Sequence, residues 1–485
     1  SGGATVIFGD TVKNIPQYLF YVSEADFYAN VIAIEIGNGA IDIGTSAFSG
    51  CIGLSKIQFG DCSQLAKIGS FAFANCSALT EVTIPDSVNT IGGFAFSGCG
   101  GLQSMTLPFI GGSATAESAS ETTLLGYIFG TTDFDGSVAS TQNYASNGAK
   151  TYYIPNSLKK VVVTGGNLYG AFSNCYMLKE IILPDTITGI GAYSFEGCSS
   201  LDSILIPASV TSIGDYAFSR CSGLSEIIIP EAVTSIGNYA FNSCSGLSSI
   251  TVPQNVITIG CQAFSECKRL QIVYYNAIRA EDLNGASNYV FDQSGSSVGG
   301  LEILIGDEVE RIPAYLFCFS NKYSSYINNV NIGHNVTEIG DYAFRACTKL
   351  VTITLPDKVT SIGDSAFADC SGLTEIILPN GLTTIERFAF SNSGLTQIII
   401  PVSMTTVGEY AFYGTALETV YYASTADDWG TIEFGMQNDA LTNTDCVYFF
   451  SKDEPVRNPD GTYNGKYWKY ASDGRTPVIW NTETV

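Results

Sequence analysis

Apolar residues along this chain recur in a block of about 23 positions. The block at Leu224 reads L-S-E-I-I-I-P and the next, at Leu247, reads L-S-S-I-T-V-P, so apolar positions alternate with others after each Leu. Alternation with a period of two predicts a short strand with one buried face, and the Pro that follows cannot donate to a strand ladder. A second short apolar piece, V-x-x-I-G, predicts another extended segment that reverses direction at Gly.

Each block closes with residues suited to an interior, a small Ala and a large Phe followed by Cys, as at Ala217, Phe218 and Cys221. One block is too small to bury its own apolar face, whereas stacked blocks cover one another. The pattern therefore predicts one stacked, β-rich solenoid. The opening Leu recurs at steps of mostly 22 or 23 residues, at Leu54, Leu79, Leu102, Leu158, Leu178, Leu201, Leu224, Leu247, Leu270, Leu350, Leu373, Leu395 and Leu417.

The segment 370–385, C-S-G-L-T-E-I-I-L-P-N-G-L-T-T-I, resembles the BspA-like, or treponemal, class of leucine-rich repeat. The resemblance extends over nearly the whole chain. It implies a leucine-rich-repeat solenoid with a curved parallel sheet on the concave face, and with turns and short helical pieces on the convex side. It also implies a secreted or cell-surface protein of host-associated bacteria, a class often described as adhesive.

The chain is expected to contain two repeat arrays, because V-I-F-G-D-T-V-K-N-I-P at 6–16 matches I-L-I-G-D-E-V-E-R-I-P at 303–313. The first array spans 1–275 and the second spans 300–423, with an inserted connection at 276–299. Each array ends in a Tyr-Tyr variant of the strand, Q-I-V-Y-Y and E-T-V-Y-Y.

Two further segments depart from the repeat. Residues 109–153 are rich in Ser, Thr, Ala and Gly and are predicted to form a long loop insertion. Such a loop is either a functional loop on a rigid scaffold or an insertion that the fold simply tolerates. Residues 424–485 hold all three Trp. A solenoid end exposes apolar surface and strand edges, so we expect this segment to be a C-terminal cap, with a small binding module as the alternative.

The charge limits the partners. Acids outnumber bases by 46 to 22, giving a net charge of −24, which disfavours nucleic acid and anionic membrane surfaces. No run of 18 apolar residues predicts a membrane span. We expect a monomer. No signal peptide is recognisable, so the expectation of an extracellular or cell-surface location depends on the resemblance.

Catalytic and metal-binding patterns are weak. The chain has one histidine, His334, in a predicted surface turn, and a catalytic triad needs a nucleophile held beside its His. The T-D-F-D-G segment with Asp133 and Asp135 lacks the other ligands of a calcium loop. Glu180 and Glu226 are predicted to be solvated residues about two repeats apart. The sequence therefore predicts no enzyme, no metal and no cofactor.

The cysteines are expected to be free and buried. Ten of the fourteen share one repeat position: Cys51, Cys76, Cys99, Cys175, Cys198, Cys221, Cys244, Cys267, Cys347 and Cys370. In-register stacking would place their Cβ atoms ~4.8 Å apart, whereas disulfides need about 3.5–4.5 Å.

The predicted partner-binding surface is a column of residues four positions after the Leu, which should point out of the concave sheet. The column carries Ile182, Leu205 and Ile228 on successive repeats, and Ile377 with Ile399 later, with Glu180 and Glu226 as an acidic rim. Exposed apolar patches mark interfaces, although β-branched residues also simply suit strands. A second column of aromatic residues, before each Ala-Phe, either stacks on sugars or covers the turn beneath it.

These observations favour a non-catalytic, secreted or cell-surface binding protein that recognises a protein or glycan, possibly host-derived, through the concave face. A structural scaffold without a single ligand site is the alternative. An enzyme that uses the insertion or the C-terminal segment is a remote third.

Overall fold

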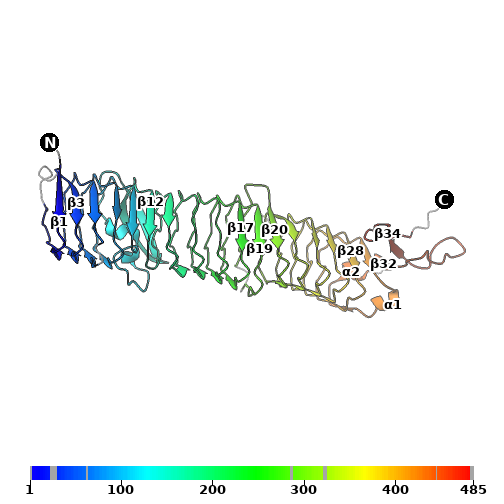
Figure 1. Cartoon of the computed structure of the whole chain (residues 1–485). Helices are drawn as coiled ribbons and strands as arrows, with labels where there is room; N and C mark the ends of the chain where they lie inside the picture. Colours follow the sequence, from blue (N-terminus) through cyan, green and yellow to red (C-terminus); the bar gives the residue numbers. More distant parts are fainter. Residues whose placement is uncertain are drawn as a thin grey trace. The chain divides into compact units, whose positions relative to one another are not determined.

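The structure is a computed structural model that describes residues 3–21, 30–61, 64–283, 288–320, 325–443 and 445–480. The chain divides into two compact units, Ser1–Ser248 and Ser249–Val485, called here the N-terminal and C-terminal units. In Figure 1 the strands within each unit follow one another in sequence order, as expected for a stack of repeats. The predicted solenoid fold of short parallel strands is confirmed. The array boundaries at 275 and 300 stay predictions.

In most repeats the strand that follows the Leu pairs in parallel with the same strand of a neighbouring repeat, for example Lys160 with Glu180 and Thr352 with Glu375. We call the solvent side of these strands the leucine face; it is the face that was predicted to be concave. The strands are β1 (Ala4–Phe8), β3 (Val31–Ile36), β5 (Lys56–Phe59), β7 (Glu81–Thr83), β9 (Ser104–Leu107), β12 (Lys160–Val163), β13 (Glu180–Ile182), β17 (Ser249–Val252), β19 (Ile272–Tyr275), β20 (Leu301–Ile305), β22 (Ile327–Asn331), β24 (Thr352–Thr354), β26 (Glu375–Ile377), β28 (Gln397–Ile400) and β30 (Thr419–Tyr422).

The second apolar piece of each repeat forms a two-residue strand, and these strands pair in parallel as well, as Ser212 does with Ser235. They close the second side of each repeat. They are β2 (Asn14–Ile15), β4 (Asp42–Ile43), β6 (Lys67–Ile68), β8 (Thr90–Ile91), β14 (Gly189–Ile190), β15 (Ser212–Ile213), β16 (Ser235–Ile236), β18 (Thr258–Ile259), β21 (Arg311–Ile312), β23 (Glu338–Ile339), β25 (Ser361–Ile362), β27 (Thr384–Ile385), β29 (Thr406–Val407) and β31 (Glu433–Phe434).

The core lies between the two sets of strands, where the repeated Leu, Phe and Cys side chains are almost fully buried. The Phe rings form stacks, with centroids 5.0 Å apart between Phe195 and Phe218 and 5.3 Å apart between Phe218 and Phe241. Each ring thus contacts the same ring of the next repeat, which holds the repeats in register.

The turn side of the regular repeats is not helical, although short helical pieces were expected there. The aromatic residue before each Ala-Phe has a left-handed backbone, as at Tyr216 (φ 55°) and Tyr239 (φ 54°), and such a residue cannot continue a right-handed helix. Among the described residues the helices are η1 (Glu121–Thr123), η2 (Leu125–Ile128), α1 (Ala426–Trp429) and α2 (Asp439–Thr442).

The insertion at 109–153 is folded, so the prediction of a long loop was wrong. Its centre forms an antiparallel hairpin of β10 (Ser137–Ala145) and β11 (Gly148–Pro155). Gln142 is fully buried and donates through Nε2 to Ser173 O at 2.9 Å, while its Oε1 accepts from Gly126 N at 2.8 Å. The N-G pair at 147–148, which is typical of hairpin turns, was the local sequence signal for this hairpin.

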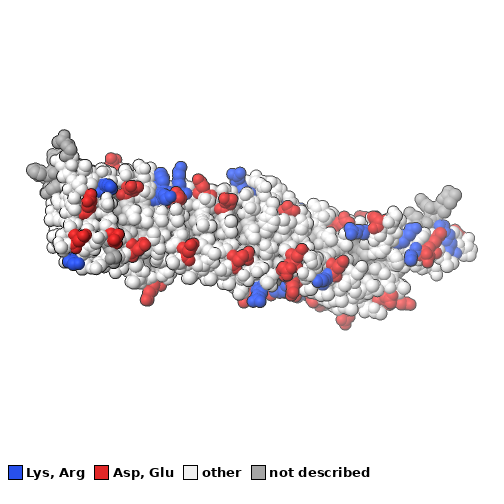
Figure 2. All heavy atoms as spheres, in the orientation of Figure 1, with Lys and Arg blue, Asp and Glu red and all other residues white. Residues whose placement is uncertain are grey.

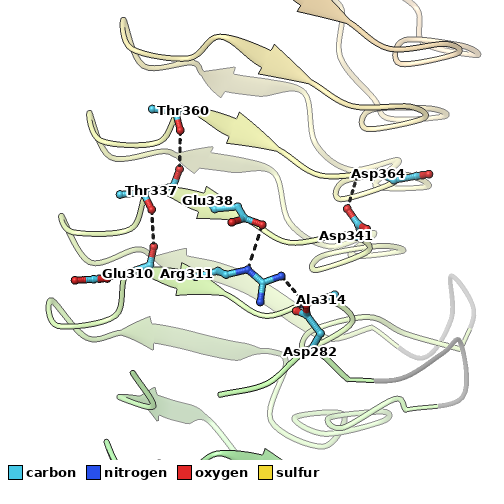
Figure 3. Close-up of polar contacts among 9 residues, drawn as sticks. All are labelled: Asp282, Glu310, Arg311, Ala314, Thr337, Glu338, Asp341, Thr360 and Asp364. Carbon is cyan, nitrogen blue, oxygen red and sulfur yellow. Dashed lines mark hydrogen bonds and ion pairs between the residues drawn. The ribbon is translucent and has the colours of Figure 1, made fainter. Parts of the chain in front are cut away.

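The connection at 276–299 takes part in the stack of the C-terminal unit. Phe291 occupies the repeated Phe position, with its ring 5.4 Å from Phe264 and 5.6 Å from Phe317. Asp282, also in the connection, accepts a hydrogen bond from Ala314 N at 2.7 Å and forms an ion pair with Arg311. Figure 3 shows Arg311 placed between Asp282 and Glu338.

The C-terminal segment covers the last repeat strand. β32 (Val447–Phe450) pairs in parallel with β30, β33 (Tyr467–Tyr470) with β32, and β34 (Pro477–Ile479) runs antiparallel to β33. Trp468 is fully buried, and its indole Nε1 donates to Tyr422 O at 2.9 Å. This packing covers the apolar strand edge that a solenoid end would otherwise expose.

Candidate functional site

The leucine face of the N-terminal unit carries a column of exposed aliphatic side chains. Ile182 is 42% exposed, Leu205 78% and Ile228 77%, so the predicted outward direction of these three residues is confirmed. Aliphatic side chains of this size are usually buried, and here they occupy equivalent positions on successive repeats. We call these three residues the aliphatic patch.

Strand alternation explains the patch. The residue before each member points inward and is nearly buried: Ile181 is 4% exposed, Ile204 7% and Ile227 6%. Residues 201–207 and 224–230 form no paired strand in the structure, although the chain keeps the extended repeat path. Leu205 and Ile228 therefore stand on segments whose side chains have few neighbours on the leucine face.

The charges beside the patch are mixed rather than purely acidic. Glu180 and Glu226 are both exposed, but Glu180 forms an ion pair with Lys160 Nζ on the neighbouring strand at 2.8 Å. Lys160 thus neutralises part of the predicted acidic rim, whereas Glu226 and the exposed Asp202 remain negative. On the face drawn in Figure 2, charged side chains are scattered over a largely uncharged surface.

The same column in the C-terminal unit is partly covered. Exposure falls along this column: Ile377 is 46% exposed, Ile399 is half-buried, and the next member, Tyr421, is 6% exposed. The ring of Trp468 lies 5.4 Å from the ring of Tyr421. The prediction that Ile399 forms an open patch with Ile377 is therefore corrected: the column runs from exposed Ile377 toward a residue buried by the C-terminal segment.

The aromatic column on the turn side is poorly arranged for sugars. Tyr193, Tyr216 and Tyr239 stack on one another with centroids 5.1 and 4.8 Å apart and nearly parallel planes. A sugar stacks on a ring face, and these faces are occupied by the neighbouring rings. The column is better explained as packing that offsets the cost of the left-handed backbone, which is on the order of 1 kcal/mol per residue.

His334 and Asp133, the residues weighed for catalysis and metal binding in the sequence, make only local contacts with exposed or nearby residues. His334 Nδ1 lies 2.7 Å from Asp307 Oδ1, and both side chains are largely exposed. Asp133 accepts a hydrogen bond from Ser137 within its own turn. Among the described residues, no group of three or more His, Cys, Asp or Glu side chains is placed to hold a metal ion.

The ten cysteines of the repeat position are free and buried, as predicted. Most of these thiols donate to a Phe carbonyl in the preceding repeat, such as Cys221 Sγ to Phe195 O at 3.0 Å, whereas Cys175 Sγ accepts from Gln142 Nε2 at 3.1 Å. Burial raises the pKa of Cys99 and of Cys198 from 9.0 to about 12. These thiols are therefore poor nucleophiles and serve packing. Cys62 lies outside the described residues.

A family comparison identifies the repeat. The model for the BspA type leucine rich repeat region matches the sequence in six copies over residues 13–125, 169–298 and 310–438, which is well over half of the chain. The chain belongs to the BspA-type leucine-rich-repeat family. The resemblance inferred from the sequence is thereby confirmed.

Solved structures of several bacterial proteins align with this BspA-type chain. A leucine-rich repeat protein from Bacteroides ovatus is 22% identical over 92% of each chain, with a TM-score of 0.45. A leucine rich cell surface protein from Faecalibacterium prausnitzii is 22% identical over 89% of this chain and 91% of its own, with a TM-score of 0.28. The Treponema pallidum leucine rich repeat protein is 20% identical over 55% and 78%, with a TM-score of 0.20. These scores are low, so the family assignment depends on the sequence match.

No curated protein matches the sequence. Among the described residues of this BspA-type chain, no helix is both long and apolar enough to cross a membrane.

Proposed function

We propose that this protein is a non-catalytic, secreted or cell-surface binding protein that recognises a protein or a glycan through the leucine face of its N-terminal unit. The observation that carries the proposal is the aliphatic patch, in which Leu205 and Ile228 are more than three-quarters exposed on adjacent repeats. Contiguous exposed apolar side chains are costly in water and tend to mark interaction surfaces.

Three features support a binding role over catalysis. The family consists of repeat regions, and stacked repeats present long, rigid surfaces. The single histidine and most of the described acids lie on exposed turns or strands, and the buried Glu196 is occupied by an ion pair with Arg220 and a hydrogen bond from Asn143. The net charge of −24 and the exposed Glu226 and Asp202 beside the patch suit a neutral or basic partner, since like charges would repel an acidic one.

The patch can be tested with Leu205→Glu and Ile228→Lys, together with Thr354→Glu as a matched control at the same repeat position in the C-terminal unit. The parent and variants would be compared for retention on immobilised extracellular-matrix proteins, mucins and a glycan array. We expect both patch variants to fold normally and to lose most of the binding of the parent, whereas Thr354→Glu retains it.

Unchanged binding by both patch variants would assign the contact to another surface. A parent that retains no single partner but assembles several would favour the scaffold function instead. Turnover of any glycan or peptide by the parent would contradict the non-catalytic assignment.

A further inference from the structure

A groove opens in the leucine face of the N-terminal unit between β5 and β7. The sheet β1-β3-β5 ends there and the sheet β7-β9-β12-β13 begins, so these two neighbouring strands share no ladder. On the other side of the same repeats, β6 and β8 remain paired through Lys67 and Thr90. The separation is therefore confined to the leucine face, where it leaves a groove of about 730 Å³.

The sequence gives a reason for the opening. The step from Leu54 to Leu79 is 25 residues, longer than the usual 22 or 23, and the two extra residues fall between Phe59 and Leu65. The Pro that ends the strand in most repeats is replaced there by Gly60. The added length enters directly after β5, so it can shift that strand relative to β7.

The groove reaches residues that are buried elsewhere in the stack. Ile57 and Phe59 are the inward positions of β5, and both are only half-buried. The ladder also breaks between β22 and β24 and between β26 and β28. The β22–β24 break has a smaller groove of about 250 Å³, in which Val330 and Ile353 are 5% and 3% exposed and Ile332 is half-buried. The β5–β7 groove is the larger of these two grooves, and both inward residues of β5 form its apolar floor.

The rim of the groove is acidic and polar. Gln58, Asp61 and Asp86 are exposed along it, and no Lys or Arg is among the residues that line it. The Asp86 carboxylate accepts a hydrogen bond from Thr164 Oγ1 at 2.5 Å, and Asp61 N donates to Asn38 Oδ1 at 2.7 Å. The first contact holds the Asp86 carboxylate in place after β7, and the second holds the backbone of Asp61 in place after β5.

An apolar floor beneath two exposed carboxylates complements a side chain with an aliphatic stem and a cationic head. We propose that the groove binds an arginine or lysine side chain presented by an exposed segment of a partner protein. The stem packs on Ile57, Phe59 and Pro85, while the head donates hydrogen bonds to Asp61, Asp86 and the Gln58 carbonyl oxygen. Charge-assisted hydrogen bonds of this kind are stronger than neutral ones. This site is separate from the aliphatic patch and does not depend on it.

The test uses the full chain with ¹³C-labelled Ile methyl groups, with the Ile57 signal assigned by an Ile57→Val variant. The probes are N-acetyl-arginine amide, its neutral isostere N-acetyl-citrulline amide, and methyl glucoside. We expect the arginine probe to shift the Ile57 signal in a saturable way, and citrulline to bind about tenfold more weakly or worse.

The double variant Asp61→Asn, Asp86→Asn should remove the preference for arginine while keeping the acceptor for Thr164. Asp185→Asn is the matched control, because Asp185 follows Pro184 as Asp86 follows Pro85, and it should change nothing. Three results would each overturn the proposal: equal binding of citrulline, an arginine preference that survives the double variant, or a methyl glucoside shift without an arginine shift. Absence of any saturable shift at the solubility limit of the arginine probe would overturn it as well.

Discussion

The column four positions after the Leu carries apolar residues in both units, and its most exposed and most buried apolar members lie in different units. In the N-terminal unit Leu205 and Ile228 are 78% and 77% exposed, whereas in the C-terminal unit Tyr421 is 6% exposed beneath Trp468. The repeat pattern determines which side chains point out of the strand. Packing by segments outside the repeat then determines whether those side chains remain exposed to solvent. An apolar residue on the leucine face is therefore a binding candidate only where no later segment covers it.

The largest expected effect comes from removing that cover. Deletion of residues 424–485 would expose Val420, Tyr421 and Tyr422, which are all buried now, together with the edge of β30. We expect the truncated chain to aggregate, because an open apolar strand edge pairs with other chains. Size-exclusion chromatography and thermal unfolding would measure this. A monomeric truncation with an unchanged melting temperature would show that the segment is an appended module.

A second prediction compares single residues in the same column. Tyr421→Ala should lower the free energy of unfolding by about 3 kcal/mol, since it removes a buried aromatic ring. Leu205→Ala should change it by less than about 0.5 kcal/mol, because a mostly exposed side chain contributes little. Urea unfolding of the two variants beside the parent gives both values. Similar losses in the two variants would mean that the exposed column is part of the core.

The sequence was sufficient for the fold and for the direction of side chains, since the Leu, Phe and Cys positions repeat and strand faces alternate. It was insufficient for the covering of Tyr421, which involves Trp468 in a segment without the repeat. The bond from Trp468 to Tyr422 joins residues 46 positions apart, and no local pattern encodes it. The β5–β7 groove was missed for a related reason: a step of 25 residues was visible, but whether the ladder closes over it is a tertiary result.

The reactivity of the cysteine thiols beneath the aliphatic patch tests whether the patch is exposed because the core under it is loosely packed. Burial raises the pKa of Cys198 from 9.0 to about 12, so this thiol should resist iodoacetamide at pH 9 in the folded protein and react after unfolding. Its folded pKa is raised, so its contribution to stability is complete below pH 9 and is lost as the pH rises toward 12. Across that window we expect a loss of about 1.4 kcal/mol per pH unit for such a thiol.

Mass spectrometry of the labelled peptides would compare how well two thiols are protected from iodoacetamide. Cys198 lies in a repeat of the exposed column, and Cys370 lies in a repeat of the partly covered column. Equal protection of both is expected, since both are fully buried. Selective labelling of Cys198 in the native protein would indicate that the open segments at 201–207 and 224–230 loosen the interior.

The smallest expected effect concerns a difference between the matching segments 6–16 and 303–313, where Asn14 of the N-terminal unit corresponds to Arg311 of the C-terminal unit. Arg311 contacts Asp282 at 2.7 Å and Glu338 at 3.1 Å (Figure 3). Burial disfavours the charged form of Asp282, but hydrogen bonds from Arg311 and from Ala314 N outweigh it and lower the pKa of that carboxyl.

Arg311→Met should therefore cost no more than about 1 kcal/mol at low salt, because these side chains are more than one-third exposed and water screens the pair. The folded pKa of Asp282 is depressed, so the difference between parent and variant should be complete above pH ~4 and shrink as the pH falls below it. Asn14→Ala, the control at the matching position, should be neutral at every pH. Urea unfolding at pH 7 and pH 3, with and without added salt, measures both variants. A pH-independent loss in Arg311→Met would assign its role to the packing of the aliphatic stem rather than to the ion pair that joins the connection to the repeats.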